Sequence, residues 1–455
     1  MKTIAAISTA TGNSGIGIIR MSGENCFEIL NKIFIPKNKN DESKGYKIKY
    51  GNIINPKTNE IIDEVLVSYF IAPKSYTTEN MCEINSHGGN IVTRKILNLC
   101  LENGAILAEP GEFTKLAFLN GRIDLSQAEA VIDLINAKSE KEAKESVKQL
   151  KGILANRINN IKNDIMSLMV DIEANIDYPE YDVEEVTNKK AINNLNNIKS
   201  NLEDLLKSFE NGKIIKEGIK VAIIGKPNAG KSSLLNAFLN EERAIVTEYE
   251  GTTRDSIEEM ITIEGIPLKI IDTAGIRNAK DEVEKIGILK AKEIAEEADY
   301  ILAIFDSCKE KDEQDEEILK ILENKNGAIL INKIDTGIYN FEKSLKIENN
   351  ENIIKISAKE GIGLSNIYKK IIKDFNLGKI DIDNNLIITN IRHKEQILKS
   401  LNNINQAINT LESGMPIDII EINIRDAWES LGEITGESVS ENMINEIFAK
   451  FCLGK

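Results

Sequence analysis

Three stretches of the chain carry apolar residues at every third or fourth position, with polar residues between them. This spacing lines one face of an amphipathic helix, and a Pro or Gly after the last apolar position is typical of a helix end. These apolar stripes span residues 147–176, 192–209 and 397–411, and the breakers that follow them are Pro179, Gly212 and Gly414. Further helical patterns begin at Leu125 and cover 417–431 and 439–451. We therefore predict helices that pack together on both sides of a central segment.

The first 115 or so residues follow a shorter period, and Gly, Pro and Asn interrupt it. Short runs rich in β-branched residues and bounded by such turn residues predict strands. We expect strands at 2–8, 16–20, 48–53, 61–70 and 81–85, and helices at 26–34 and 91–103. The sequence thus predicts an N-terminal α+β domain.

Charge and composition narrow the class of protein. The chain has 455 residues, of which 57 are basic and 72 acidic, so its net charge is −15. A protein that wraps nucleic acid by itself usually has a basic surface, so this charge argues against that role. The length predicts about three domains, and no apolar run is long enough to cross a bilayer. Five scattered cysteines and only two histidines argue against structural zinc and fit a reducing cytoplasm, where we expect the protein to act.

Residues 225–233 read Gly-Lys-Pro-Asn-Ala-Gly-Lys-Ser-Ser and directly follow the apolar run 219–224. A strand, this loop and a helix at 234–239 predict a P-loop, in which backbone N–H groups surround the β-phosphate of a nucleotide. Lys231 is placed to reach the β- and γ-phosphates, and the Ser232 hydroxyl to bind Mg²⁺. A lone P-loop pattern arises by chance on the order of a few times per hundred chains of this length, so further motifs are needed.

Those motifs follow in the order expected of a guanine-nucleotide site. Asp272-Thr273-Ala274-Gly275 comes after the apolar run 268–271 and predicts a carboxylate that holds Mg²⁺ through water. The base-reading motif is Asn332, Lys333 and Asp335, and the base-supporting motif is Ser357, Ala358 and Lys359. The Asp335 carboxylate accepts two hydrogen bonds that guanine donates and adenine cannot match. The four motifs together predict that the chain binds GTP.

The residue that orients the attacking water differs from the Ras-type pattern. Ile276 stands where Ras-type enzymes carry a glutamine, so another group must position the water. Glu284, in the acidic segment 281–284, is a candidate. By itself, however, an acidic segment of this kind favours an ordinary helix start.

A second difference lies in the P-loop. Asn228 offers a neutral oxygen beside the phosphates, and such oxygens with loop carbonyls suit a monovalent cation. A cation there would neutralise charge in the transition state, a task that Arg254 or Arg277 could perform instead. Thr253 is the natural switch ligand of Mg²⁺.

The order of these segments predicts a multidomain chain of α+β and α/β parts. We expect an N-terminal α+β domain at 1–118, a helical domain in two parts at 119–215 and 379–455, and an inserted Ras-like P-loop GTPase domain at 216–378. Because both ends of the inserted domain join the same helical body, movement of its switches can be transmitted to that body.

The whole chain resembles the MnmE (TrmE) family of tRNA-modification GTPases. The resemblance rests on the P-loop with Asn228, the segment 251–255 (Gly-Thr-Thr-Arg-Asp), the inserted position of the GTPase domain and the C-terminal 451–455 (Phe-Cys-Leu-Gly-Lys). It implies a potassium-activated GTP hydrolase that forms a homodimer and, with an FAD-containing MnmG-type flavoprotein, a heterotetramer. The two proteins would add an aminomethyl or carboxymethylaminomethyl group to C5 of the wobble uridine (U34) of certain tRNAs, which are bound mainly with the partner. The one-carbon unit is implied to come from 5-formyl- or methylene-tetrahydrofolate.

The resemblance also assigns residues by matched position. Contacts to GTP or GDP are implied for Asn228, Ala229, Gly230, Lys231, Ser232, Ser233, Thr247, Glu248, Tyr249, Glu250, Gly251, Thr252, Thr253, Asp272, Thr273, Ala274, Gly275, Asn332, Lys333, Asp335, Ser357, Ala358 and Lys359. Mg²⁺ ligands would be Ser232 and Thr253, and K⁺ ligands Asn228, Thr247, Tyr249 and Thr252. Glu284 matches the carboxylate that orients water, and folate binding maps onto Arg20, Glu83, Arg122 and Lys455.

Two further interpretations stay open. Cys452 is implied to lie near the folate and to be functionally important, but it also fits a small buried side chain, and it stands in a poor match to a prenylation box. A regulatory or ribosome-assembly GTPase without one-carbon chemistry is the alternative function. The folate residues distinguish the two, because a carboxylate such as Glu83 can pair with pterin donors, while Arg and Lys suit folate carboxylates.

Overall fold

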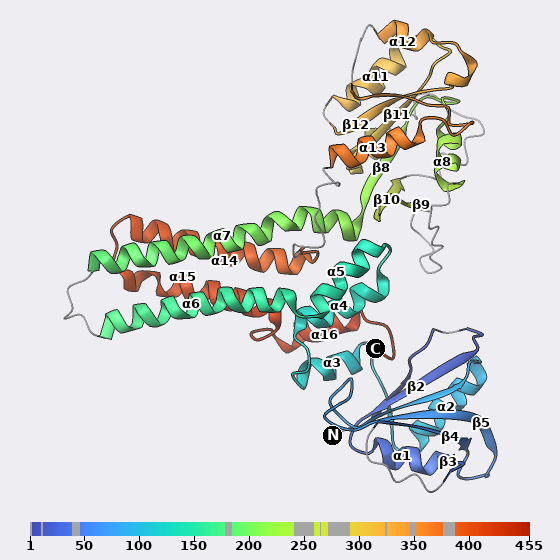
Figure 1. Ribbon diagram of the computed structural model, residues 1–455, viewed down its shortest axis with the longest axis vertical. Coiled ribbons are helices and arrows are strands. Elements are labelled where there is room, and N and C mark those ends of the chain that lie inside the picture. Colours follow the sequence, from blue (N-terminus) through green and yellow to red (C-terminus); the bar gives the residue numbers. More distant parts are fainter. Residues whose placement is uncertain are drawn as a thin grey trace. The chain divides into compact units, whose positions relative to one another are not determined.

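The computed structural model describes residues 2–10, 12–38, 46–177, 184–240, 259–263, 265–271, 292–323, 325–345, 351–375 and 387–455 (Figure 1). These residues form two compact units. Unit 1 contains residues 1–136, 146–200 and 396–455, and unit 2 contains residues 137–145 and 201–395.

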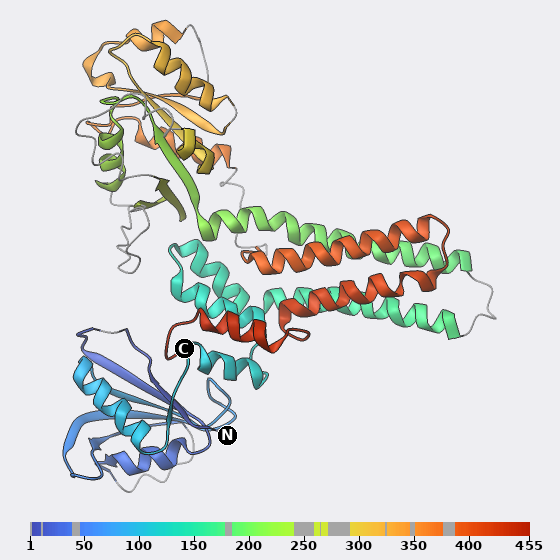
Figure 2. The ribbon, with the colours of Figure 1, turned by 180° about the vertical axis from the view of Figure 1, so that it is seen from behind.

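The N-terminal part of unit 1 is a mixed sheet with helices against it, as predicted. Its seven strands are ordered β3-β4-β5-β6-β2-β1-β7. Their bounds are β1 Ile4–Ile7, β2 Ile16–Ser22, β3 Phe34–Pro36, β4 Lys47–Ile54, β5 Ile61–Phe70, β6 Met81–His87 and β7 Ile106–Leu107. Helices α1 (Cys26–Ile33) and α2 (Asn90–Glu102) pack into one apolar core with the buried strand residues Ile19 and Ile84. Both views of the ribbon place these helices beside the sheet (Figures 1 and 2).

The remainder of unit 1 is helical, which confirms the prediction from the apolar stripes. Its helices are α3 Glu112–Leu119, α4 Leu125–Asn136, α6 Ile153–Asp177, α15 Glu421–Thr435 and α16 Glu441–Ala449, with a short 3₁₀ turn at Ile417–Ile420. Three more helices, α5 (Glu140–Leu150), α7 (Glu184–Glu217) and α14 (Ile391–Glu412), have residues in both units. Helices α6 and α15 pack against each other, and Ile158, Ile165 and Leu431 are fully buried.

Two glycines change the helix boundaries that the sequence suggests. The stripe at 147–176 is divided between α5 and α6 because Gly152 adopts a left-handed backbone conformation (φ 78°) between them. The stripe at 192–209 was expected to stop at Gly212, but α7 continues to Glu217. An ideal Cβ at Gly212 would lie 1.9 Å from the Ile388 carbonyl oxygen, so the glycine serves close packing and not a helix end.

The predicted α/β domain is the larger part of unit 2. Its six strands are ordered β13-β12-β11-β8-β10-β9, and every neighbouring pair is parallel except β10 with β9. The strands are β8 Ile219–Ile224, β9 Glu259–Ile263, β10 Ile266–Ile271, β11 Tyr300–Asp306, β12 Gly327–Asn332 and β13 Ile353–Lys355. Its helices include α8 Lys231–Asn240, α11 Glu313–Leu322, α12 Asn340–Leu345 and α13 Leu364–Asp374. The carboxyl ends of β8, β11 and β12 lie at one edge of the sheet, which is where such folds bind ligands.

Candidate nucleotide-binding site

The loop between β8 and α8 has the backbone shape of a phosphate-binding loop. Asn228 and Gly230 both have positive φ, 64° and 108°. An ideal Cβ at Gly230 would lie 2.1 Å from the Asn332 side-chain nitrogen, so only glycine fits there. The loop leads directly into α8, whose first two residues are Lys231 and Ser232, and the N-terminal end of a helix favours anions.

Lys231, the first residue of α8, is partly buried. Its Nζ donates hydrogen bonds to the carbonyl oxygens of Gly225 at 2.6 Å and Lys226 at 2.8 Å. Burial lowers the pKa of its ammonium group below the ordinary value. The ammonium is therefore held beside the phosphate-binding backbone, and an anionic phosphate would offset its desolvation.

Asn332 connects three of the sequence motifs. Its side-chain nitrogen donates to the Ala229 carbonyl at 2.8 Å, and its side-chain oxygen accepts from the Ala358 N–H at 2.9 Å. The next residue, Lys333, has a positive φ of 69°, and its Nζ lies 2.5 Å from a carboxylate oxygen of Asp306. The phosphate-binding, base-reading and base-supporting loops are thus brought together at one edge of the sheet.

Asp335 is the residue expected to read the base, and its side chain is exposed to ligand. The Ser357 hydroxyl donates to one of its carboxylate oxygens at 2.6 Å. This hydrogen bond is the main reason why the pKa of Asp335 lies below its ordinary value. The group is therefore ionised at neutral pH and acts only as an acceptor, which suits the N1–H and 2-amino donors of guanine.

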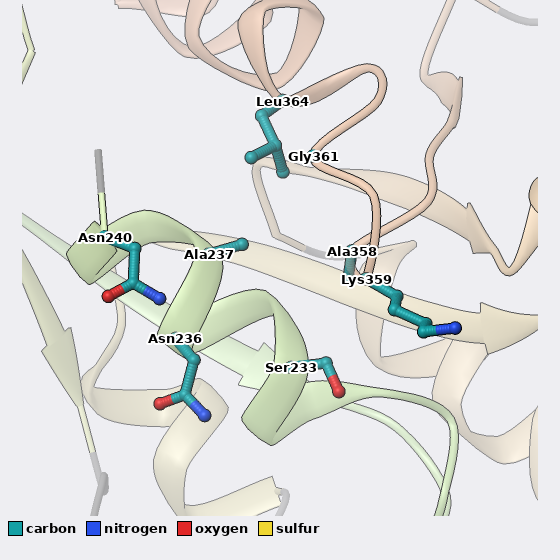
Figure 3. Close-up of a pocket in the computed structure, with 8 residues that line it drawn as sticks. All are labelled: Ser233, Asn236, Ala237, Asn240, Ala358, Lys359, Gly361 and Leu364. Carbon is teal, nitrogen blue, oxygen red and sulfur yellow. The ribbon is translucent and has the colours of Figure 1, made fainter.

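A cavity of about 440 Å³ lies between α8 and the loop that precedes α13 (Figure 3). It is lined by Ser233, Asn236, Ala237, Asn240, Ala358, Lys359, Gly361 and Leu364. Ser233, Ala358 and Lys359 were predicted from the sequence as nucleotide contacts. Asn236 and Asn240 were not, although their i, i+4 spacing places both on one face of α8.

The switch residues lie outside the described residues. These are Thr247, Glu248, Tyr249, Glu250, Gly251, Thr252, Thr253, Asp272, Thr273, Ala274, Gly275 and Glu284, together with the possible arginine fingers Arg254 and Arg277. Of the expected cation ligands, the structure places Ser232 in the first turn of α8 and Asn228 in the P-loop. Both offer neutral side-chain oxygens beside the phosphate-binding backbone, which fits Mg²⁺ for Ser232 and a monovalent cation for Asn228.

Arg20, Glu83 and Arg122, three of the residues expected to bind folate, meet in unit 1, and Lys455 directly follows Gly454, whose carbonyl contacts Arg20. Arg20 on β2 and Glu83 on β6 are paired across the antiparallel strands. The Arg20 guanidinium donates two hydrogen bonds, at 2.9 and 2.7 Å, to the same oxygen, Oε1 of Glu83. A third nitrogen of Arg20 lies 3.3 Å from the Gly454 carbonyl, which also accepts from Ser8 at 2.9 Å. The C-terminal segment is thereby fixed against the first strands.

An aromatic residue that the sequence did not single out lies within this cluster. The guanidinium carbon of Arg20 lies 5.4 Å from the centroid of the Tyr76 ring, and the guanidinium carbon of Arg122 lies 4.5 Å from it. Its hydroxyl pairs with Thr114 at 2.9 Å. Within the cluster's C-terminal segment, Cys452 is exposed, and its carbonyl accepts from the Gly111 N–H at 3.3 Å. His87, the last residue of β6, pairs through Nδ1 with Asp63 at 2.7 Å.

A largely parallel sheet whose carboxyl edge carries a P-loop, an Asn-Lys-x-Asp loop and a Ser-Ala-Lys loop defines a P-loop GTPase, so this chain is a GTP hydrolase. Two family models match the chain: the MnmE helical domain over residues 125–452, a range that includes the P-loop domain, and the GTP-binding protein TrmE N-terminus over residues 3–122. The chain belongs to the MnmE family of tRNA modification GTPases.

Relatives match along the whole chain. The tRNA modification GTPase MnmE of Acetivibrio thermocellus is 49% identical over 457 residues, which cover 100% of this chain and 99% of the relative. That of Finegoldia magna is 47% identical and covers 99% of each chain. A solved structure of Era in complex with MgGDPNP and 16S ribosomal RNA is 30% identical, covers 34% of this chain and 56% of that chain, and has a TM-score of 0.24. No helix among the described residues is long and apolar enough to span a membrane.

Proposed function

We propose that this chain is a potassium-activated GTPase that, with an FAD-containing MnmG-type partner, adds an aminomethyl or carboxymethylaminomethyl group to C5 of the wobble uridine of certain tRNAs. The observation that carries the one-carbon part is the cluster of Arg20, Glu83 and Arg122 with the C-terminal segment. A GTPase that only switches has no use for such a cluster. The proposed organisation is the one expected from the sequence: domains at 1–118, 119–215 with 379–455, and 216–378, in a cytoplasmic homodimer that joins the partner in a heterotetramer and binds tRNA mainly with it.

In the nucleotide site, Lys231 would bind the β- and γ-phosphates and Ser232 would hold Mg²⁺ with Thr253. Bound Mg²⁺ and K⁺ supply positive charge that offsets the charge developing on the phosphates. Asn228 would hold K⁺ with Thr247, Tyr249 and Thr252. Glu284 would orient the attacking water, and Asp335 selects guanine.

In the folate site, the geometry of the Arg20–Glu83 pair suggests a division of tasks. Both hydrogen bonds from Arg20 end on Oε1 of Glu83, so Oε2 remains available to a second donor. We assign Oε2 to the N3–H and 2-amino group of a pterin. Because Arg20 is neutralised by Glu83, we assign the glutamate carboxylates of a tetrahydrofolate to Arg122 and Lys455. Cys452 would lie beside this ligand.

Potassium activation is tested by GTP turnover of the full chain in matched KCl and NaCl buffers. We expect faster hydrolysis in KCl, and Asn228→Ala should abolish that difference. Light scattering with a fluoride transition-state mimic should report dimer closure in KCl only. Equal rates of the unaltered protein in both salts would contradict the cation site and would assign its task to a side chain such as Arg254.

Folate binding is tested by calorimetric titration with 5-formyl-tetrahydrofolate. We expect Glu83→Ala to weaken binding at least tenfold, since a carboxylate that accepts charged or paired donors contributes roughly 1.5–3 kcal/mol. Glu60→Gln, an exposed glutamate at a neighbouring strand, is the control. Unchanged affinity in the Glu83 variant would rule out the pterin assignment, and no binding by the unaltered protein would rule out the folate site.

A further inference from the structure

Lys226, the second residue of the P-loop, forms ion pairs with two aspartates at the start of α11. Its Nζ lies 2.7 Å from Asp312 and 2.7 Å from Asp315. The side chain of Lys226 is 18% exposed, that of Asp315 only 2% and that of Asp312 57%. The pair with Asp315 is therefore the buried one, and an ion pair shielded from water is worth more than an exposed one when one partner is removed.

The helix fixes the Asp315 carboxylate independently of Lys226. Asp312 caps α11: its side chain accepts from the Asp315 N–H at 3.1 Å. In return, Oδ2 of Asp315 accepts from the Asp312 N–H at 3.2 Å. This reciprocal capping box holds the carboxylate in one orientation before it meets the lysine.

The backbone of Lys226 takes part in the phosphate-binding loop itself. Its carbonyl oxygen accepts from Lys231 Nζ at 2.8 Å and from the Ala229 N–H at 3.3 Å. The side chain of Lys226 thus contacts the capping box of α11. Its main chain contacts the rest of the loop and Lys231, the lysine expected to bind phosphate.

We propose that Lys226 is a positioning residue for nucleotide binding: its ion pair with the buried Asp315 holds the P-loop on α11 in the shape that receives the phosphates. The carboxylates of Asp312 and Asp315 already pair with the ammonium group of Lys226. Lys226 therefore acts by holding the loop and not by contact with the nucleotide. The ion pair lengthens the lifetime of the bound nucleotide, because a loop that is not held in place opens more often.

The test is binding and release of a fluorescent GDP analogue by the full chain. Lys226→Met should weaken binding about tenfold or more, mainly through faster release, because it leaves a buried carboxylate unpaired. Asp315→Asn retains a side-chain acceptor for the capping box but removes the charge, and it should weaken binding to a similar extent. Lys226→Arg should restore near-normal binding. In steady-state hydrolysis the loss should raise KM more than it lowers kcat.

Two further variants distinguish the positioning role of the Lys226–Asp315 pair from separate effects of each residue and from a general effect of breaking an ion pair. The double variant Lys226→Met with Asp315→Asn should be no weaker than either single variant, because both remove the same ion pair. Lys370→Met breaks a partly buried ion pair with Asp374 in α13, 2.6 Å long and away from the loop, and should leave GDP release unchanged.

Three results would overturn the proposal. Normal binding by Asp315→Asn together with weak binding by Lys226→Met would mean that Lys226 contacts the nucleotide directly. Additive losses in the double variant would mean that the two residues act separately. Normal binding by Lys226→Met would mean that the ion pair has no role. If Lys226→Met does not fold, the other two variants decide. Normal GDP binding by Asp315→Asn, or weak binding by Lys226→Arg, would then contradict the proposal.

Discussion

The Asp335 carboxylate is held by a serine that is distant in sequence. The hydroxyl of Ser357, which comes from a different loop, donates to the carboxylate and lowers its pKa further below neutral pH. Arg20 and Glu83 show the same dependence, since two side chains that sequence reasoning assigned to separate parts of a folate are bonded to each other. In both cases the residue type predicts which hydrogen bonds the side chain can form. The neighbouring side chain decides which of its atoms remain available to a ligand.

Asp335→Ala should abolish discrimination between GTP and ATP. The change removes the acceptor that pairs with the two guanine donors, so we expect GTP affinity to fall at least a hundredfold with ATP affinity little changed. Competition of both nucleotides against a fluorescent GDP analogue measures this. Ser357→Ala is the control, since it should weaken GTP binding while the preference for guanine persists. Retained selectivity in the Asp335 variant would contradict its role.

Nucleotide binding should take up a proton at alkaline pH through Lys231. Burial lowers the pKa of this lysine in the ligand-free protein, and bound phosphates should raise it again. Above the ligand-free pKa, binding therefore requires protonation, and GDP affinity should fall as pH rises through that range. Calorimetric titration of GDP in two buffers of different ionisation enthalpy measures the uptake. Equal enthalpies in both buffers at alkaline pH would contradict it.

The helices follow the apolar stripes, but their ends depend on contacts that the stripes do not reveal. Gly152 separates α5 from α6, as glycine often does, whereas Gly212 lies within α7. Glycine is normally unfavourable inside a helix by roughly 0.5–1 kcal/mol, so a stop at Gly212 was the natural prediction. The close approach of the 387–388 backbone reverses this preference.

Gly212→Ala should destabilise the protein although alanine is the better helix former. The added methyl would lie 1.9 Å from the Ile388 carbonyl oxygen, and such overpacking costs about 1–3 kcal/mol. Urea unfolding followed by circular dichroism measures the change. Lys213→Ala, at the exposed neighbouring position of the same helix, should stay within about 0.5 kcal/mol of the unaltered protein. An increase in stability on Gly212→Ala would show that the backbone approach is not that close.

Across the chain, the two candidate sites belong to different compact units. The nucleotide site lies in unit 2 and the Arg20–Glu83 cluster in unit 1. A ligand stabilises the part that binds it, by about 2.7 kcal/mol at a concentration of a hundred times its Kd.

Scanning calorimetry should therefore resolve separate responses to the two ligands. GDP should raise the transition of the unit with the P-loop, and 5-formyl-tetrahydrofolate should raise the other one. Asp335→Ala serves as the control that removes the GDP shift alone. A single transition raised by both ligands would mean that the units unfold together.

The sequence by itself determined the features that depend on neighbouring residues. The P-loop with Lys231, the order of the four motifs, the strand at 219–224 and the helical stripes all follow from spacing and residue type within short windows, and the structure contains each of them that falls in the described residues. The resemblance to the MnmE family rested on the P-loop with Asn228, the segment 251–255, the inserted position of the GTPase domain and the C-terminal 451–455.

Only the tertiary structure decided which distant groups meet. Asn332 bonds to Ala229 and Ala358, Lys226 pairs with Asp315, and both Arg20 and Arg122 lie near the Tyr76 ring. Each of these contacts joins segments far apart in the chain. The continuation of α7 beyond Gly212 likewise depends on the distant backbone at Ile388. The spacing of apolar residues predicts that one face of a helix is buried, but it does not identify the residues that cover that face. These contacts arise only when packed elements bring distant segments together, and they set loop shape and helix length.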